Sequence, residues 1–208
     1  MESNLGPNII DFYGLPGSGK STASHNVALK YKNNGKKVVE PSYDLDHEKH
    51  KISRKIYKLS ILLRTFFFSH KTYLFFKHLA KKNGYTIKNG QINQISNICL
   101  KIHFLKKYNK RKLDYIIFDE GIAQAAISLS INSKIAPSQN LKDILLGIKQ
   151  KIKIQYIYIP CEVNTALERV ASRNSKDTRI EKQRTRAAQF LLMNRYNELV
   201  SEIRGSVA

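Results

Sequence analysis

Residues 8–21 carry the strongest indication of the fold, and they read Asn8-Ile9-Ile10-Asp11-Phe12-Tyr13-Gly14-Leu15-Pro16-Gly17-Ser18-Gly19-Lys20-Ser21. The first part of this stretch is a β-branched and aromatic run that predicts a strand, and a glycine loop ends it. The residues from Ser21 to Lys32 have helical character and stop at Asn33-Asn34-Gly35, a signal for a helix C-terminus. A strand, a glycine loop and a helix in this order form the setting of a phosphate-binding loop.

The loop from Gly14 to Ser21 fits the P-loop pattern of two glycines separated by four residues, Gly14 and Gly19, followed by lysine and serine. Glycines let backbone N–H groups approach a phosphate, and the helix N-terminus adds partial positive charge. Lys20 is expected to reach the β- and γ-phosphates, and the Ser21 hydroxyl to ligate Mg²⁺. We therefore predict ATP and Mg²⁺ as ligands, bound by Gly14, Pro16, Gly17, Ser18, Gly19, Lys20, Ser21 and Thr22.

The rest of the chain alternates between strand and helix patterns. Apolar runs predict further strands at 37–40, 113–119 and 152–159. Helices are expected at 48–82, 91–108, 121–131, 139–150, 164–172 and 181–203. This alternation predicts an α/β fold with a mainly parallel sheet, in a single domain spanning 1–208. Residues 48–110 form a basic helical insertion between the second and third strands.

Positive charge is concentrated in that insertion. The chain carries a net charge of +20, and residues 47–112 hold 17 Lys and Arg against one acid, Glu48. Such a field favours anionic partners, so contact with a membrane or nucleic acid is expected through 48–112. Lysines spread over solvated helix faces explain the same composition. Aromatic residues near lysines suit a membrane interface, or alternatively burial against the sheet: Phe66-Phe67-Phe68 and Phe75-Phe76, beside Lys71 and Lys77.

Composition also bears on where the protein works. Cys99 and Cys161 are the only cysteines, too few and too far apart for a disulfide framework. The first residues lack a signal-peptide pattern, and the chain has no apolar run long enough to span a membrane. We predict a cytoplasmic protein that can associate peripherally with a membrane surface. The sequence does not fix the oligomeric state, and a homodimer is compatible with it.

A carboxylate is expected near the metal, at the end of a strand beside the loop. Asp119 follows the apolar run 115–118 and is predicted to hold Mg²⁺ through water. An ordinary helix N-cap is the alternative role for Asp119. Glu120 is expected to point toward an acceptor site or to be a solvated charge, and Gln124, one turn later, to face the same cleft.

A second set of acids follows the second predicted strand. Glu40-Pro41 ends this strand at the edge where active sites of such sheets lie. Glu40 is predicted to accept the proton of an acceptor hydroxyl as a general base. Asp44 and Asp46, in the loop expected to follow, compete for this role. The alternative is a turn with solvated acids.

Arginines follow the fourth predicted strand. Arg169 and Arg173 are four residues apart on one helix face, and Arg179 follows in a polar loop expected to form a lid. Phosphoryl transfer builds negative charge, and one positioned arginine contributes a factor of about 10³–10⁵ in rate. We predict that these arginines bind ATP and that Arg173 is catalytic. A charged helix face paired with Glu168 and Glu181 is the alternative.

Together these motifs resemble the P-loop kinases of small molecules, above all thymidylate kinases and deoxynucleoside kinases. The resemblance rests on the loop from Gly14 to Thr22, on Glu40-Pro41, and on the arginine-bearing segment 166–181. It implies the three-layer P-loop NTPase fold with strand order 2-3-1-4. It also implies ATP as donor and lid arginines that clamp its phosphates.

Two features depart from these families. No arginine follows Asp119, where the sequence is Asp119-Glu120-Gly121, and no apolar run remains after 181–203 for a fifth strand. The first hypothesis is therefore a kinase whose acceptor is open among nucleosides, nucleotides and sugars. The second is a P-loop ATPase or nucleotide-binding module that docks on nucleic acid or an anionic membrane through its basic helices.

Overall fold

The computed structural model describes residues 6–48, 51–68, 91–109, 111–131, 153–173 and 179–207, with single positions 74, 77, 78, 81 and 145. Within these residues the chain forms a four-stranded sheet of order β2-β3-β1-β4 in which every pairing is parallel. The strands are β1 (Asn8–Gly14), β2 (Val38–Val39), β3 (Tyr115–Phe118) and β4 (Ile154–Ile159). The predicted α/β class and strand order 2-3-1-4 are confirmed.

The central strand β1 is buried on both faces. It pairs in parallel with β3 on one side and with β4 on the other. Ile10 and Phe12 enter the smaller of two cores, whereas Ile9 and Tyr13 enter the larger core on the opposite face. Because both faces are covered, the strand is apolar on both sides apart from Asp11 and does not alternate.

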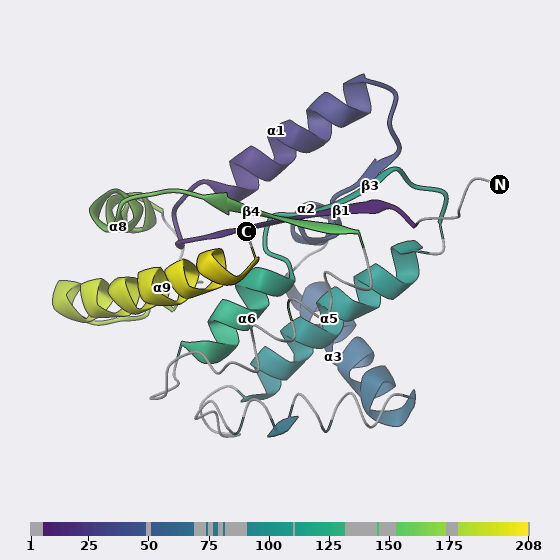
Figure 1. Ribbon diagram of the computed structural model, residues 1–208. Coiled ribbons are helices and arrows are strands. Elements are labelled where there is room, and N and C mark those ends of the chain that lie inside the picture. Colours follow the sequence, from purple (N-terminus) through teal and green to yellow (C-terminus); the bar gives the residue numbers. More distant parts are fainter. Residues whose placement is uncertain are drawn as a thin grey trace.

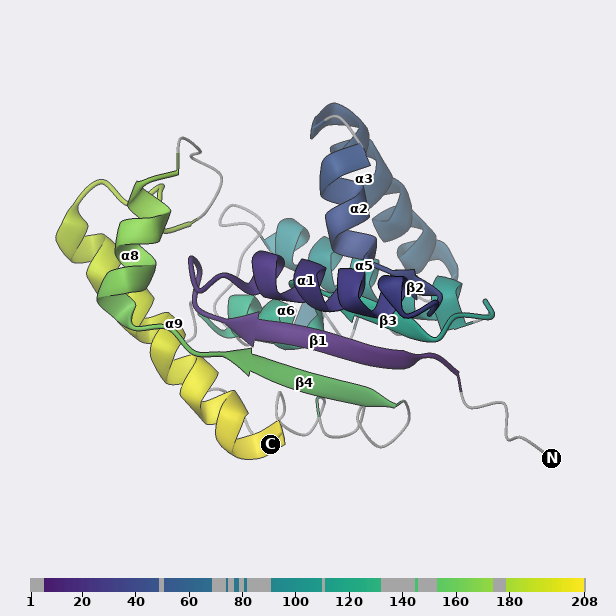
Figure 2. The ribbon, with the colours of Figure 1, turned by 90° about the horizontal axis from the view of Figure 1, so that it is seen from above.

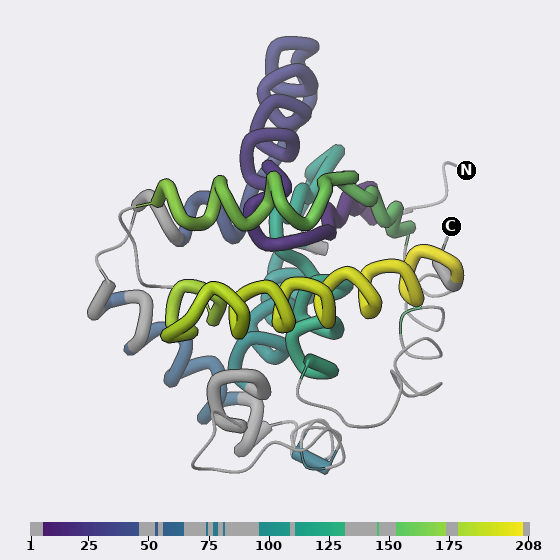
Figure 3. The backbone as a smooth tube through the Cα atoms, turned by 90° about the vertical axis from the view of Figure 1, so that its left-hand side faces the viewer, coloured from purple at the N-terminus to yellow at the C-terminus, as the bar shows by residue number. Residues whose placement is uncertain are grey.

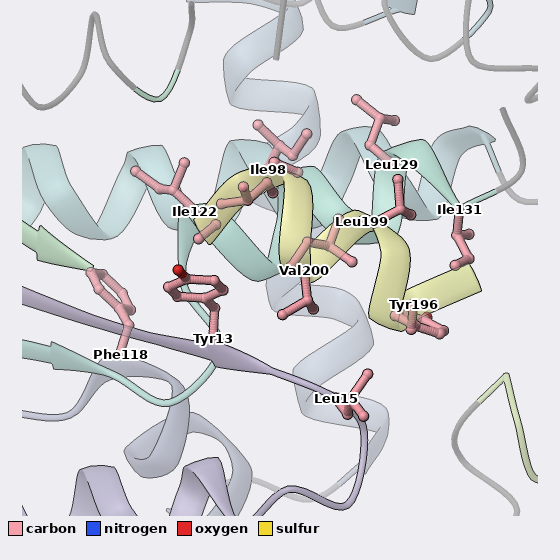
Figure 4. Packing of buried hydrophobic residues seen from close by; sticks show 14 of the residues in the cluster. Tyr13, Leu15, Ile98, Phe118, Ile122, Leu129, Ile131, Tyr196, Leu199 and Val200 are labelled. Atoms are coloured by element: carbon pink, nitrogen blue, oxygen red, sulfur yellow. The ribbon is translucent and has the colours of Figure 1, made fainter. Parts of the chain in front are cut away.

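Helices cover the two faces of the sheet. One face carries α1 (Lys20–Asn33), which starts where the glycine loop ends. The other face carries α5, α6 and α9, as Figure 1 shows. In this core, Phe118 and Tyr13 of the sheet lie near Ile98, Ile122 and Val200 of the three helices (Figure 4). These helices are α5 (Gln91–Asn109), α6 (Ile122–Ser130) and α9 (Arg186–Val207).

The carboxyl edge of the sheet is where connecting segments gather. Here α2 (Pro41–Glu48) follows β2, and α8 (Val163–Ala171) follows β4. Viewed from above, α8 lies beyond the ends of β1 and β4 (Figure 2). Figure 3 shows α8 and α9 running side by side across this edge. Side chains from distant parts of the sequence therefore meet at one edge.

Some predicted boundaries were wrong. The chain is already helical from Pro41, so Asp44 and Asp46 lie on α2 and not in a loop. Proline suits the first turn of a helix, where its missing N–H has no partner to lose. The last helix begins at Arg186 and not at 181.

In the insertion 48–110, the predictions can be compared with the structure only over the described residues. Of the one or two helices expected at 48–82, the structure describes α3 (Lys51–Phe68), which packs against α5. The side chains of Phe66-Phe67-Phe68, the residues Lys71 and Phe75-Phe76, and most of the helix expected at 139–150 lie outside the described residues. Among the described residues, no helix combines the length and apolar character needed to cross a membrane.

Candidate functional site

The glycine loop turns sharply between β1 and α1. Gly17 and Gly19 have φ values of 86° and 91°, in the left-handed region that other residues rarely adopt. A Cβ atom at Gly17 would lie 2.5 Å from the carbonyl oxygen of Ala166 in α8. The loop therefore requires glycine at Gly17 for two reasons, the backbone angle and the close approach of α8.

Lys20 is a buried cation at the base of this loop. It is 5% exposed, and its Nζ donates to the carbonyl oxygens of Leu15 at 2.8 Å and Gly14 at 3.3 Å. Burial lowers the pKa of Lys20, and the nearby carboxylates of Glu120 and Asp119 oppose that shift. Within the described part of the chain, Lys20 forms no ion pair. A buried ammonium without a counter-ion is costly, and an anionic ligand relieves this cost.

A second polar atom of the loop also lacks a partner. The Ser18 hydroxyl oxygen is buried and has no hydrogen-bond partner among the residues that the structure describes. Buried polar groups nearly always have partners, so an exception indicates a ligand or water. Together with Lys20, Ser18 makes the loop a good fit for an anion with several acceptor oxygens.

The two residues predicted to hold a metal ion lie in contact. Ser21 lies at the start of α1, and its hydroxyl donates to Oδ2 of Asp119 at 2.9 Å. Asp119 directly follows β3, and its Oδ1 accepts from the Glu120 N–H at 2.9 Å. Hydroxyl and carboxylate oxygens suit Mg²⁺, which takes one or two protein ligands and fills its shell with water and phosphate oxygens.

A cavity of about 630 Å³ opens beside the loop. It lies between the glycine loop, the first turns of α1, the end of β4 and the last turn of α8. The cavity lining includes four residues of the predicted phosphate-binding loop and two of the three predicted arginines. The lining residues are Gly17, Ser18, Gly19, Thr22, Ala23, Asn26, Ile159, Arg169, Ser172 and Arg173.

The three predicted arginines divide between two locations. Arg169 and Arg173 are exposed and line the cavity. Arg173 also lies close enough to Lys20 to contribute to the lowering of its pKa. Arg179 is outside the lining, and its guanidinium donates to the Ser128 carbonyl oxygen of α6 at 3.2 Å. The predicted contact of Arg179 with ATP is therefore not assembled in this structure.

Glu40 is not arranged as a free general base. Its side chain is 3% exposed, with Oε1 2.7 Å from Lys32 Nζ and Oε2 2.9 Å from His25 Nδ1. The His25 ring in turn stacks on Tyr43, with the ring centres 4.3 Å apart. Lys32 and His25 both belong to α1, so Glu40 connects the end of β2 to the helix that follows the glycine loop. Glu40 was predicted to face an acceptor, but in the structure its carboxylate faces Lys32 and His25. The sequence alone did not reveal these two partners.

The other predicted acceptor residues also separate. Glu120 is exposed at the end of β3, and Asp44 is half-buried on α2. Gln124 is buried, and its Oε1 accepts from the Gly14 N–H at 3.3 Å. Gln124 therefore supports the loop and does not face a cleft beside Glu120. Pro16 is half-buried in the loop but is not part of the cavity lining.

Sequence reasoning missed Asp11. This acid is fully buried in β1, and its carboxylate accepts hydrogen bonds from the backbone N–H groups of Gly121, Ile122 and Ala123. Burial raises the pKa of Asp11 to about 6, although these three hydrogen bonds oppose that shift. Asp11 caps α6 from the neighbouring strand and so fixes the turn that presents Asp119 to Ser21. The available signal was an acid in the middle of an apolar strand.

Sequence reasoning also missed Lys101, because this lysine lies in the insertion 48–110 and belongs to no recognisable motif. Its Nζ donates to the Ser42 hydroxyl at 2.7 Å and lies 5.8 Å from the centre of the Phe118 ring. Ser42 lies in the first turn of α2, and Phe118 ends β3. Lys101 thus places a positive charge beside the carboxyl ends of β2 and β3.

In comparisons with known proteins, no protein-family model and no curated protein matches this chain. What the chain does is therefore inferred from the residues assembled at the carboxyl edge of the sheet.

Proposed function

We propose that this protein is an ATP-dependent phosphotransferase that moves the γ-phosphoryl group of ATP to a small-molecule acceptor. One observation carries the proposal: the buried Lys20, which forms no ion pair with the described residues, lies at the base of a glycine loop whose Ser21 is hydrogen-bonded to Asp119 across 98 positions of sequence. A chance glycine turn has no need of a buried cation on one side and a hydroxyl–carboxylate pair on the other. The resemblance of the same residues to small-molecule kinases supports this proposal.

Each residue of the donor side then has a role. Lys20 and the loop N–H groups bind the β- and γ-phosphates, and Ser21 and Asp119 hold Mg²⁺, which would neutralise phosphate charge when bound. Arg169 and Arg173, on the opposite wall of the cavity, stabilise the charge that develops on the transferred group. The 630 Å³ cavity is in the size range of small-molecule sites and leaves room for a nucleotide.

In the transfer step, one bond to the γ-phosphorus forms and one breaks. An acceptor oxygen bonds to the γ-phosphorus while the bond from that phosphorus to the β–γ bridging oxygen breaks, and ADP leaves. A hydroxyl acceptor also loses its proton. Glu120 is exposed at the end of β3, whereas both oxygens of Glu40 are already paired, so Glu120 is the stronger candidate for the base.

Purified protein with ATP and Mg²⁺ is expected to release ADP faster when the right acceptor is added. The panel should include nucleosides, nucleoside monophosphates and sugars, with ADP release measured by a coupled assay and the phosphorylated product identified by mass spectrometry. Slow hydrolysis that no acceptor changes, but that nucleic acid or anionic vesicles raise, would refute the transferase proposal and favour an ATPase.

Replacing Arg173 with alanine is expected to lower kcat about 10²-fold or more, because charge on the transferred phosphoryl group loses a stabilising partner. The KM for ATP should change much less, since the loop and Lys20 remain. Steady-state kinetics of Arg173→Ala can be compared with Arg111→Ala, which removes an exposed arginine before β3, at the opposite edge of the sheet. Equal kcat values for the two variants would mean that Arg173 is an ordinary surface charge with no part in catalysis.

A further inference from the structure

The outer face of α3 is apolar and exposed. Ile56, Leu59 and Leu63 are 64%, 53% and 49% exposed, respectively. Spacings of three and four residues bring them onto one side of the helix. Ile61, on the other side, is only 4% exposed and belongs to the larger core. Figure 1 shows α3 on the outside of α5, away from the sheet.

The same helix carries only positive charge. Its sequence contains five Lys and Arg residues and no Asp or Glu: Lys51, Arg54, Lys55, Lys58 and Arg64. Arg64 is exposed directly beside Leu63. Farther along the chain, Leu74 is 46% exposed, and Lys77 and Lys81 are exposed. On α3 itself, the exposed apolar stripe and an exposed positive charge occur together at Leu63 and Arg64.

An exposed apolar stripe next to positive charge favours an anionic membrane over nucleic acid as the partner of α3. Nucleic acid presents phosphates and sugars, which match the lysines but leave an exposed Ile–Leu stripe without contacts. An anionic bilayer matches both features, because leucine side chains enter the boundary between headgroups and acyl chains while Lys and Arg attract acidic headgroups.

We propose that α3 docks the protein on an anionic membrane surface. Ile56, Leu59 and Leu63 enter the interfacial layer, and Arg64 lies at the level of the lipid headgroups. The proposal does not depend on the transferase function, because none of these residues belongs to the loop, the cavity lining or the Ser21–Asp119 pair.

The test is co-sedimentation of the full-length protein with vesicles of phosphatidylcholine alone or with about 30% phosphatidylserine. We expect binding to the anionic vesicles only, weakened by salt. The double variant Leu59→Gln/Leu63→Gln should bind about tenfold less tightly, since two interfacial leucines are lost without a change in charge. Leu29→Gln/Leu191→Gln is the matched control, because these leucines are 42% and 70% exposed on α1 and α9. It should bind like the unmodified protein.

Three results would overturn the proposal. The first is equal binding to neutral and anionic vesicles. The second is the same affinity for both double variants, which would mean that α3 does not make the contact. The third is a dimer by light scattering that only the α3 variant converts to a monomer, which would mean that a second copy covers the stripe.

Discussion

Replacing Lys20 with methionine is expected to lower kcat/KM for phosphoryl transfer by about 10³-fold, because the β- and γ-phosphates lose their buried cation. The free protein should unfold at nearly the same temperature as before. Removing a desolvated ammonium is favourable, whereas leaving the Leu15 and Gly14 carbonyl oxygens without this donor is unfavourable, and each effect is worth about 1–3 kcal/mol. Activity and stability are thus expected to separate in this variant.

Thermal unfolding with and without ATP and Mg²⁺ checks both halves of this prediction. A ligand at about 100 times its dissociation constant stabilises a protein by about 2.7 kcal/mol, and the variant should lose this stabilisation. Lys30→Met is the control, because Lys30 is exposed on the same helix. A Lys20→Met protein that folds and still transfers phosphate at the normal rate would contradict the role given to the loop.

Much of the fold could be predicted from local pattern. The runs at β1 and β3 are mostly buried, and the apolar run of the partly buried β4 is closed by Pro160, so the strands stand out from the helices. Boundaries were less certain near Pro41, where proline reads as a stop after a strand but in fact opens α2. The described segments of the insertion are helical as predicted, but their sequence does not show which helix packs against the sheet.

The donor side of the site was predictable for a similar reason. Glycine spacing and the position of an acid after a strand are local signals, and they led to the Ser21–Asp119 contact. Glu40 and Gln124 were less predictable because their roles depend on partners that are distant in sequence or on an adjacent helix. Glu40 is buried against Lys32 and His25 of α1, and Gln124 is buried against the N–H of Gly14. Residue type and spacing alone do not specify such pairs.

The connection between β1 and α6 depends on the absence of a side chain at Gly121. A Cβ atom there would collide with the Asp11 carboxylate, 2.6 Å from its Oδ2 atom and closer to Oδ1 and the carboxyl carbon. This collision is separate from the preference of glycine for positive φ, because φ of Gly121 is −94°. Asp11 itself cannot move easily, since it is fully buried and holds three backbone N–H groups.

Gly121→Ala is therefore expected to lower the free energy of unfolding by about 2–4 kcal/mol, through lost hydrogen bonds and a displaced buried carboxylate. The same change should weaken the Mg²⁺ dependence of ATP binding, because the displaced turn carries Asp119. Gly205→Ala is the matched control: a Cβ atom at this helical position meets nothing within 4 Å, so alanine should be neutral or stabilising by up to about 1 kcal/mol. Denaturant unfolding of both variants measures the difference. Equal stabilities would mean that Asp11 and the start of α6 are not tightly joined.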